Sequence, residues 1–472
     1  MPQRRSLIAP SAAQSGLAAA LAALRTEIDA STEFSPEALE EAASATAPAP
    51  ALDLREVPFA TLDPAGSMDL DQAFHLERTG SGYTIRYAIA DVPSFVIPGG
   101  ALDDAARARG ETLYAADGTI PLHPRALSED RASLLPDVDR PALVWTFALD
   151  ADGATTGTRL ERALIRSRAK LDYVAVQADL DAGRDGPAAL LPEIGRLRLA
   201  QEAARGGASL NLPDEEVMRG ADGAYAIERR SPLPVEDWNA QLSLMTGMAA
   251  AQLMLQAKVG ILRTMPQPDD AAFAAFRRQT EALGRPWTSG RYGDYLRGLD
   301  REDPAALSVL EAAASLFRGA GYAAFDGEIP ADTVQAAIAA PYAHATAPLR
   351  RLVDRWSLAI ALAVSEEREV PAWVRESLAE VPALMRAGAQ RAATLNARTL
   401  DLVEAALLSG RVGETFPAVV VRRSGERATI QLTDPPVTAS MPLAEDIPAG
   451  STVRVTLTSA DVPTGRIGFA LV

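Results

Sequence analysis

Three carboxylates lie within one short stretch of the sequence, from Thr61 to Gln72. Asp63, Asp69 and Asp71 fall within nine residues, and the proline, glycine and serine between them favour a loop. An apolar run precedes the stretch, so we expect the cluster at the end of a buried strand. Carboxylates held this close repel one another, and a hard divalent cation with oxygen ligands relieves the repulsion. The cluster is therefore either a magnesium or manganese site or a solvated acidic turn.

Spacing alone does not decide which metal chemistry such a site would serve. An EF-hand loop is excluded, because no register supplies both the glycine at its sixth position and the glutamate at its twelfth. Asp69-Leu-Asp71 is also compatible with the Asp-x-Asp motif of a metal-dependent glycosyltransferase. The residue pattern leaves both a nuclease and a transferase open.

The composition limits the class of protein. The chain has 472 residues, of which 48% are hydrophobic and 23% charged, which is typical of a globular protein with more than one domain. The absence of cysteine excludes disulfides, thiolate metal sites and cysteine nucleophiles, and only three histidines argue against a histidine-rich zinc site. The net charge of −16 argues against non-specific coating of nucleic acid, although a basic channel inside an acidic shell remains compatible with it. No apolar run has transmembrane length.

Residues 1–50 are expected to form a small helical domain. Arg4-Arg5 and the apolar run after it resemble a twin-arginine signal, but charged residues follow without a small-residue cleavage site, which disfavours export. Leucines at helical spacing predict an amphipathic helix instead. Ser35-Pro36-Glu37 has the N-cap, proline and acid that open a second helix, and the Ala/Pro-rich stretch 43–50 reads as a linker.

The next part of the chain mixes strands and helices. Residues 83–89 and 142–149 have the patterns of strands, and the part from 235 to 408 is expected to be mostly helical. Arg166 and Arg168 share one face if their segment is extended. That face is either a phosphate-facing strip or an ordinary solvated surface.

A second group of polar residues lies in Tyr342-Ala-His-Ala-Thr-Ala-Pro-Leu-Arg-Arg351. Thr346 is expected to cap a helix that begins directly after it, with proline in the first turn. This would put Arg350 and Arg351 beside free backbone N–H groups, which favour a bound anion such as phosphate. The alternative is a surface arginine pair, one member of which bridges to Asp354.

Residues 411–472 change to β character. Glycines and prolines separate five predicted strands, at 417–422, 428–432, 437–441, 452–457 and 467–472. Five short strands in a terminal segment predict an OB-like barrel. Phe416 and Phe469 are its only aromatic residues, so it lacks the base-stacking platform typical of single-strand binders.

In chain order, several motifs resemble the signature of the RNase II family, the RNB exoribonucleases. They are Asp53-Leu-Arg-Glu-Val-Pro-Phe-Ala-Thr-Leu-Asp63 with Asp69 and Asp71, Ala88-Ile-Ala-Asp-Val92, Arg109-Gly-Glu-Thr-Leu-Tyr114, Ile120-Pro-Leu-His-Pro124, Leu127-Ser128, Ala132-Ser-Leu134, Arg140, and the segment from Tyr342 to Arg351. Ala347 stands where this family usually has serine. The resemblance implies an α+β multidomain protein, with an RNB catalytic domain of mixed sheet plus helices at 51–410 and an OB-fold RNA-binding domain at 411–472.

The resemblance also implies an activity, which is processive 3′→5′ hydrolysis of single-stranded RNA to nucleoside 5′-monophosphates. The cofactor would be Mg²⁺, for which Mn²⁺ can substitute. The protein would be a cytoplasmic monomer that binds neither double-stranded DNA nor a membrane.

Roles are carried over residue by residue. Asp63, Asp69 and Asp71 match acids that bind metal and position the attacking water, with Gln72 as a further ligand. Arg350 matches the arginine that holds the scissile phosphate. The expected RNA-binding residues are Tyr114, which would stack on the 3′-terminal nucleotide, His344, Thr346, Arg351, Arg166 and Arg168.

The sequence departs from the family pattern at three places. Gln72 stands where the family usually has aspartate, and a glutamate of a late helix falls near Asn396. The first 50 residues are too few for the pair of cold-shock barrels usual in the family, so the N-terminal RNA guide is missing or replaced. The replacement is either a helix-turn-helix-like unit or a small helical domain that contacts the neighbouring catalytic surface. Gln72 and Asn396 motivate the alternative of a catalytically weakened RNA-binding protein on the same fold.

Overall fold

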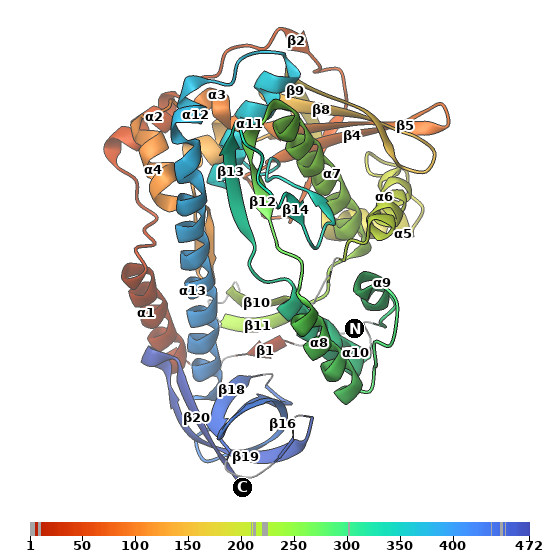
Figure 1. The fold of residues 1–472 in the computed structure, drawn as a ribbon. Coiled ribbons are helices and arrows are strands. Elements are labelled where there is room, and N and C mark those ends of the chain that lie inside the picture. The colour runs from red at the N-terminus through yellow and green to blue at the C-terminus, as the bar shows by residue number, and fades with distance from the viewer. Residues whose placement is uncertain are drawn as a thin grey trace.

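The computed structural model describes residues 5–7, 11–208, 210, 214–219, 225–300, 303–435, 437–443, 447–448 and 450–472. A curled mixed sheet surrounded by helices forms the larger unit, and a separate antiparallel sheet forms the C-terminal end (Figure 1). This is the α+β architecture with a C-terminal β-barrel that the sequence predicted.

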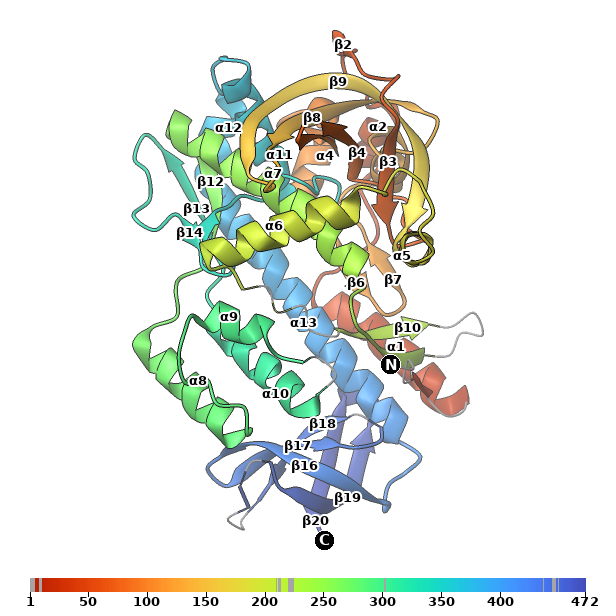
Figure 2. The same cartoon turned by 90° about the vertical axis from the view of Figure 1, so that its right-hand side faces the viewer.

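The larger unit is built on a six-stranded sheet in the order β2-β9-β3-β4-β5-β8. The long strand β9 runs antiparallel to β8 and, further along, parallel to β3, so the sheet curls back on itself (Figure 2). The strands predicted at 83–89 and 142–149 are confirmed as parts of β5 and β8. The six strands are β2 (Leu52–Asp53), β3 (Phe59–Asp63), β4 (Gln72–Thr79), β5 (Gly82–Ala90), β8 (Asp139–Leu149) and β9 (Thr155–Asp172).

Apolar layers cover both faces of this sheet, because its residues alternate between them. Along β5, Tyr83, Ile85, Tyr87 and Ile89 face one layer, and Ala88 and Ala90 face the other. The first layer contains residues of α7 (Pro234–Ala257) and α11 (Leu352–Ser365). The second contains residues of α3 (Val92–Phe95), α4 (Ala101–Arg109) and the turn Leu127–Arg131.

The part from 235 to 408 is mostly helical, as predicted. It also contains two antiparallel strand pairs, β12 (Val259–Thr264) with β13 (Gly321–Asp326) and β14 (Val334–Gln335) with β15 (Ala340–Pro341). These strands were not predicted, because a short apolar run does not distinguish a strand from a buried helix, and the partner of β12 lies far along the chain. The helices of the middle region are α5 (Tyr173–Asp181), α6 (Leu191–Arg205), α8 (Asp270–Ala282), α9 (Tyr292–Arg297), α10 (Pro304–Ala313), α12 (Ala372–Ser377) and α13 (Val381–Leu408).

The first 50 residues contain the two predicted helices, α1 (Ser11–Glu27) and α2 (Pro36–Ser44). Ser35 caps α2, since its hydroxyl accepts a hydrogen bond from the backbone of Ala38 at 3.2 Å. A further strand, β1, was not expected. It belongs to a small antiparallel sheet of β1 (Arg5–Leu7), β11 (Tyr225–Arg230) and β10 (Asp214–Arg219). The domain boundaries themselves remain a prediction.

The C-terminal unit follows α13, the long helix that joins it to the larger unit (Figure 1). Its five strands are antiparallel in the order β18-β17-β16-β19-β20, and the edge strands β18 and β20 approach each other, which nearly closes the sheet. The strands are β16 (Thr415–Ser424), β17 (Arg427–Leu432), β18 (Thr438–Pro442), β19 (Thr452–Asp461) and β20 (Arg466–Leu471). All five predicted strands are therefore confirmed. Among the described residues, no helix combines the length and apolar character needed to cross a bilayer.

A buried ion pair joins the two layers of the larger unit. The carboxylate of Asp103 on α4 accepts hydrogen bonds from Arg355 of α11 at 2.5 Å and from Arg107 at 3.1 Å. Burial alone would raise the pKa of Asp103, but the two arginines and the backbone N–H of Gly99 outweigh it, and the pKa is lowered. The carboxylate is therefore ionised and anchors α11, whose N-terminus follows Arg350 and Arg351.

Removing this carboxylate should destabilise the fold. We expect Asp103→Ala to lower the free energy of unfolding by about 3–5 kcal/mol, because it leaves the buried Arg355 without its counter-charge. Denaturant unfolding measures the change. Asp104→Ala on the exposed side of the same helix is the control, and a comparable loss there would show that removal of an acid from the first turn, and not loss of the ion pair, causes the effect.

Candidate active site

The acidic residues lie where β3 ends and β4 begins, at one edge of the sheet. Asp63 is the last residue of β3, and the loop that follows returns to β4 at Gln72. Ser133 fixes this loop, because its hydroxyl accepts from the backbone of Leu70 at 3.0 Å and donates to the carbonyl of Met68 at 2.6 Å. The predicted strand-end position of the cluster is confirmed.

Asp71 connects the acidic loop to the segment before α11. It is 2% exposed, and its Oδ1 accepts a hydrogen bond from the backbone N–H of Leu349 at 2.8 Å. Its Oδ2 lies 3.6 Å from Nε of Arg350. Asp71 and Arg350, 279 residues apart in the sequence, thus form the centre of the site.

Side chains from several elements hold the backbone of the segment that carries Arg350. The amide nitrogen of Gln72 donates to the carbonyl of Thr346, and Oδ1 of Asp354 accepts from the backbone of Ala347 at 2.7 Å. His123 is buried next to this segment, and burial lowers the pKa of its ring to about 3, so the ring is neutral. Sequence analysis missed this position of His123, for which a lone histidine in an apolar motif gives no signal.

The charges of the site are not balanced by the protein alone. Burial raises the pKa values of Asp63, Asp69 and Asp71, to about 6 for Asp63 and well above the usual range for Asp71, although Arg350 opposes the shift at all three. Oδ2 of Asp63 is buried without a hydrogen-bond partner. These groups would gain from an additional positive charge.

The carboxylates fit a hydrated metal site better than a site in which the protein supplies every ligand. In the part of the chain that the structure describes, no three Asp, Glu or His side chains approach closely enough to hold a metal ion by themselves. Mg²⁺ commonly uses only one or two carboxylates and completes its shell with water and substrate phosphate oxygens. The orphaned oxygen of Asp63 and the carboxylates of Asp69 and Asp71 therefore suit a hydrated magnesium ion rather than an all-protein cage.

Tyr114 lies beside the acids. It belongs to β6 (Leu113–Ala115), and its side chain is 55% exposed in a cavity of about 320 Å³. Asp69, Thr119 and Leu349 also line this cavity. An exposed aromatic ring next to carboxylates and an arginine can stack on a flat polar ligand that carries negative charge.

Other predicted site residues have different surroundings. Arg351 forms a two-pronged ion pair with Asp354, at 2.8 Å for both contacts, and donates to the hydroxyl of Thr346 at 3.3 Å. His344 hydrogen-bonds the hydroxyl of Tyr322 at 2.8 Å through Nδ1. Thr346 and Arg351 thus participate in the internal bonding of the segment. The alternative prediction, a bridge to Asp354 from the arginine four residues before it, names Arg350. In the structure Arg351 makes this bridge, three residues before Asp354, and Arg350 lies beside Asp71.

Arg166 and Arg168 lie away from the acidic cluster. Arg166 pairs with Asp139 at 2.6 Å, and Arg168 donates to the carbonyl of Arg55 at 2.6 Å. Asp63 pairs with residue 172 of β9, so Arg168 lies roughly 13 Å and Arg166 roughly 20 Å back along that strand. Their role in RNA binding remains a prediction.

The expected start of the helix near residue 347 is wrong. α11 begins at Leu352, and Thr346 does not cap it. The reason is a short antiparallel pairing, in which Glu111 bridges Arg351 and the backbone of Thr112 donates to the carbonyl of Arg350 at 2.9 Å. This pairing keeps Arg351 extended and delays the helix.

The RNB domain model matches residues 51–360, which is more than half of the chain. The chain belongs to the RNB family. A second model, the RNase II-type exonuclease C-terminal S1 domain, matches residues 414–472 of this RNB protein. The resemblance inferred from the motifs is therefore confirmed.

Known proteins resemble this RNB chain in sequence and in fold. Ribonuclease R of Escherichia coli is 29% identical over 336 residues, which cover 67% of this chain and 40% of that protein. RNase R of Mycoplasma genitalium, solved with ribose-methylated single-stranded RNA, has a TM-score of 0.86 at 17% identity and covers 96% of this chain and 77% of that one. Yeast Ssd1, described as a pseudonuclease, has a TM-score of 0.72 at 14% identity, covering 95% of this chain and 57% of Ssd1. At such identities the solved structures show the fold alone, and this chain matches well under half the length of the E. coli relative.

The raised pKa of Asp63 predicts a pH-dependent cost in the metal-free protein. The folded state favours the neutral acid, so the penalty is complete above pH 6 and disappears as the pH falls below the unfolded value of about 4. We expect Asp63→Asn to raise the free energy of unfolding by up to about 3 kcal/mol at pH 7 in EDTA, and by almost nothing at pH 4. Denaturant unfolding at four pH values tests this. A difference that does not change with pH contradicts it.

Proposed function

We propose that this chain is a metal-dependent 3′→5′ exoribonuclease that processively shortens single-stranded RNA and releases nucleoside 5′-monophosphates. The observation that carries the proposal is the pairing of buried Asp71 with the partly exposed Arg350, beside Asp63 and Asp69. Phosphodiester hydrolysis needs both features, because negative charge must be neutralised on the phosphate and a water must be activated.

The aspartates and Arg350 would have different roles, because their environments differ. Asp63, Asp69 and Asp71 would hold Mg²⁺, or Mn²⁺ in its place, which supplies a Lewis acid for the phosphate and a more acidic bound water. The side chain of Arg350 is 47% exposed, so its guanidinium can bind the scissile phosphate without leaving Asp71. Asp71 and the neighbouring backbone bonds fix its position, which reduces the reorganisation needed during reaction.

The cavity beside Tyr114 supports an exonuclease that acts at a chain end. Its volume of about 320 Å³ lies within the range of sites for small ligands, about 300–1,000 Å³, and suits one terminal nucleotide. The ring of Tyr114 would stack on that base. The single-stranded RNA in the Mycoplasma genitalium structure supports the substrate class. We extend the proposal to a monomer that acts in the cytoplasm and does not use double-stranded DNA.

A catalytically weakened RNA-binding protein is the second candidate. It is favoured by Gln72, which stands where the family usually has aspartate, and by a pseudonuclease with the same fold. However, the amide nitrogen of Gln72 donates to the carbonyl of Thr346, a contact that an ionised aspartate could not make. We therefore interpret Gln72 as a support for the Arg350 segment.

The decisive assay uses 5′-labelled single-stranded RNA and its DNA counterpart, with Mg²⁺ and with EDTA. We expect Mg²⁺-dependent shortening of RNA to one short product, with DNA spared. Asp71→Asn should lower the rate at least about 100-fold, because it removes a ligand charge, and should change RNA affinity only slightly. Asp104→Ala is the control. RNA that the wild-type protein retains but never shortens would favour the second candidate.

Gln72→Glu separates the two interpretations of Gln72 with almost no change in size. Since a carboxylate cannot donate to the Thr346 carbonyl, we expect kcat to fall about tenfold while RNA affinity in EDTA stays within twofold. If Gln72 were a weak metal ligand instead, the added charge would lower the Mg²⁺ concentration needed for half-maximal rate. Titrating the cleavage rate with Mg²⁺ decides between these outcomes.

A further inference from the structure

The hairpin that carries Tyr114 has two faces with different surroundings. It consists of β6 (Leu113–Ala115) and β7 (Gly118–Ile120), in register so that Leu113 opposes Ile120 and Tyr114 opposes Thr119. Tyr114 and Thr119 line the cavity beside Asp69. Because side chains alternate across a strand, Leu113 and Ile120 point the opposite way and are buried.

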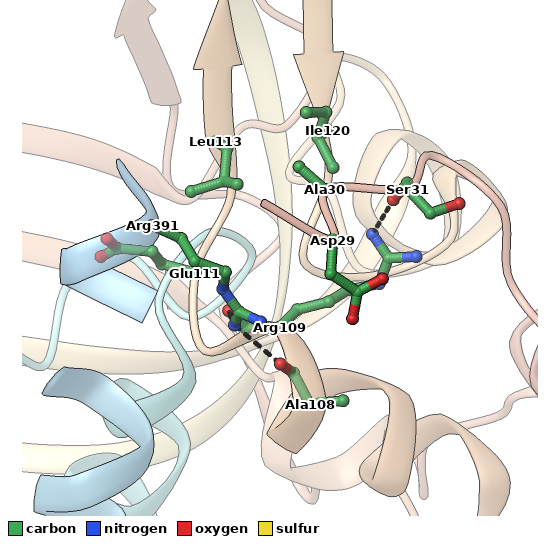
Figure 3. Close-up of a pocket in the computed structure, with 9 residues that line it drawn as sticks. All are labelled: Asp29, Ala30, Ser31, Ala108, Arg109, Glu111, Leu113, Ile120 and Arg391. Atoms are coloured by element: carbon green, nitrogen blue, oxygen red, sulfur yellow. Dashed lines mark hydrogen bonds between the residues drawn. The ribbon is translucent and has the colours of Figure 1, made fainter. Parts of the chain in front are cut away.

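The N-terminal region covers the buried face of this hairpin. Leu113 and Ile120 belong to one apolar cluster with three leucines of α1 and with Ala30, and Figure 3 shows Ala30 next to Ile120. The leucines of α1 are Leu17, Leu21 and Leu24. The cluster also includes Leu395 and Leu402 of α13 and Val462 of the C-terminal unit. The apolar face of α1 and the buried face of the Tyr114 hairpin therefore share one hydrophobic core.

An ion pair fixes the tip of the hairpin to the same helix. Arg25, in the last turn of α1, lies 2.7 Å from Oδ2 of Asp117, which is in the turn between β6 and β7. The two side chains are 28% and 12% exposed. Oδ1 of Asp117 is buried and has no hydrogen-bond partner. Arg25 therefore compensates the negative charge of the Asp117 carboxylate.

Arg109 holds the segment after α1 in place. Its guanidinium donates to the carbonyls of Ser31 at 2.7 Å and Glu33 at 2.5 Å, and lies 3.8 Å from the ring centre of Phe34. Arg391 of α13 in turn donates to the carbonyls of Ala108 and Arg109 (Figure 3). The end of α1 is thus fastened to the catalytic unit next to the hairpin.

The base of the hairpin is joined to the catalytic segment. The backbone of Thr112 donates to the carbonyl of Arg350 at 2.9 Å, and that of Leu352 donates to the carbonyl of Gly110 at 3.0 Å. The hairpin is thereby attached to Arg350 at its base and to Arg25 at its tip. Tyr114 lies between the two attachments.

We propose that α1 is a positioning element for the terminal nucleotide, and that Arg25 and Asp117 are positioning residues which act through Tyr114. This inference rests on the proposed function and gives the N-terminal region a role different from guiding RNA into the site. An aromatic ring stacks well only at a defined height and angle, so the hairpin must be held from behind. α1 provides that support, and the ion pair fixes the hairpin turn.

Stacking at the 3′ end can be measured without cleavage. A single-stranded RNA with 2-aminopurine at its 3′ terminus loses fluorescence when the base stacks, and EDTA prevents hydrolysis. We expect the wild-type protein to quench the probe and Tyr114→Ala to remove most of the quenching. Arg25→Ala should reduce it severalfold, and Arg25→Lys, which keeps the charge, should restore much of it.

A double mutant tests whether Arg25 acts through Tyr114. If it does, Arg25→Ala has no further effect in the Tyr114→Ala background, and both single variants release a longer end-product from labelled RNA with Mg²⁺. Glu27→Ala is the matched control, since Glu27 on the same helix pairs with Arg398 of α13 at 3.1 Å and does not touch the hairpin. It should leave quenching and product length unchanged.

The outcomes separate this inference from the proposed function. Equal losses from Arg25→Ala with and without Tyr114, or the same loss from Glu27→Ala, would show a general structural role of α1 and overturn the inference. Normal quenching by Arg25→Ala and Asp117→Asn would overturn it as well. A wild-type protein that quenches the probe but never shortens RNA would refute the proposed nuclease while leaving the positioning role of α1 supported.

Discussion

Asp71 buries its carboxylate between the start of β4 and the segment before α11, where it meets the backbone of Leu349 and the side chain of Arg350. A carboxylate removed from water is costly unless charges and donors surround it. The single backbone donor and the partly exposed arginine compensate only in part, since the pKa of Asp71 stays well above its usual range. The site is therefore assembled in a state that favours additional positive charge.

Hydrogen bonds to the backbone of the segment before α11 fix the position of Arg350. Gln72 and Asp354 come from different parts of the fold and bond the consecutive residues Thr346 and Ala347 of its segment. The extended pairing with Gly110 to Thr112 prevents the helix from starting earlier. As a result, the backbone of Arg350 is fixed and its partly exposed side chain is held beside Asp71, where it can bind a ligand, which is the arrangement that electrostatic preorganisation requires.

Much of the local structure could be predicted from residue patterns, but the long-range contacts could not. Alternating apolar residues predicted β5, and five short strand patterns predicted the C-terminal sheet. The close spacing of three aspartates predicted the acidic cluster. The contact of Asp71 with Arg350 could be anticipated only from the family motif, because nothing local to either residue reports on the other. The predicted start of α11 was wrong and the strands β12 and β13 were not predicted, for the same reason. In each case a pairing partner distant in sequence decided the local conformation.

The length of α13 has a consequence for the separation of the two units that it joins. Gly388 of this helix packs against Gly110 near the catalytic segment, and Leu408 belongs to the core of the C-terminal unit. Twenty helical residues between them correspond to about 30 Å. The helix is a continuous element of fixed length, so it sets how far the C-terminal core lies from the catalytic segment along its axis.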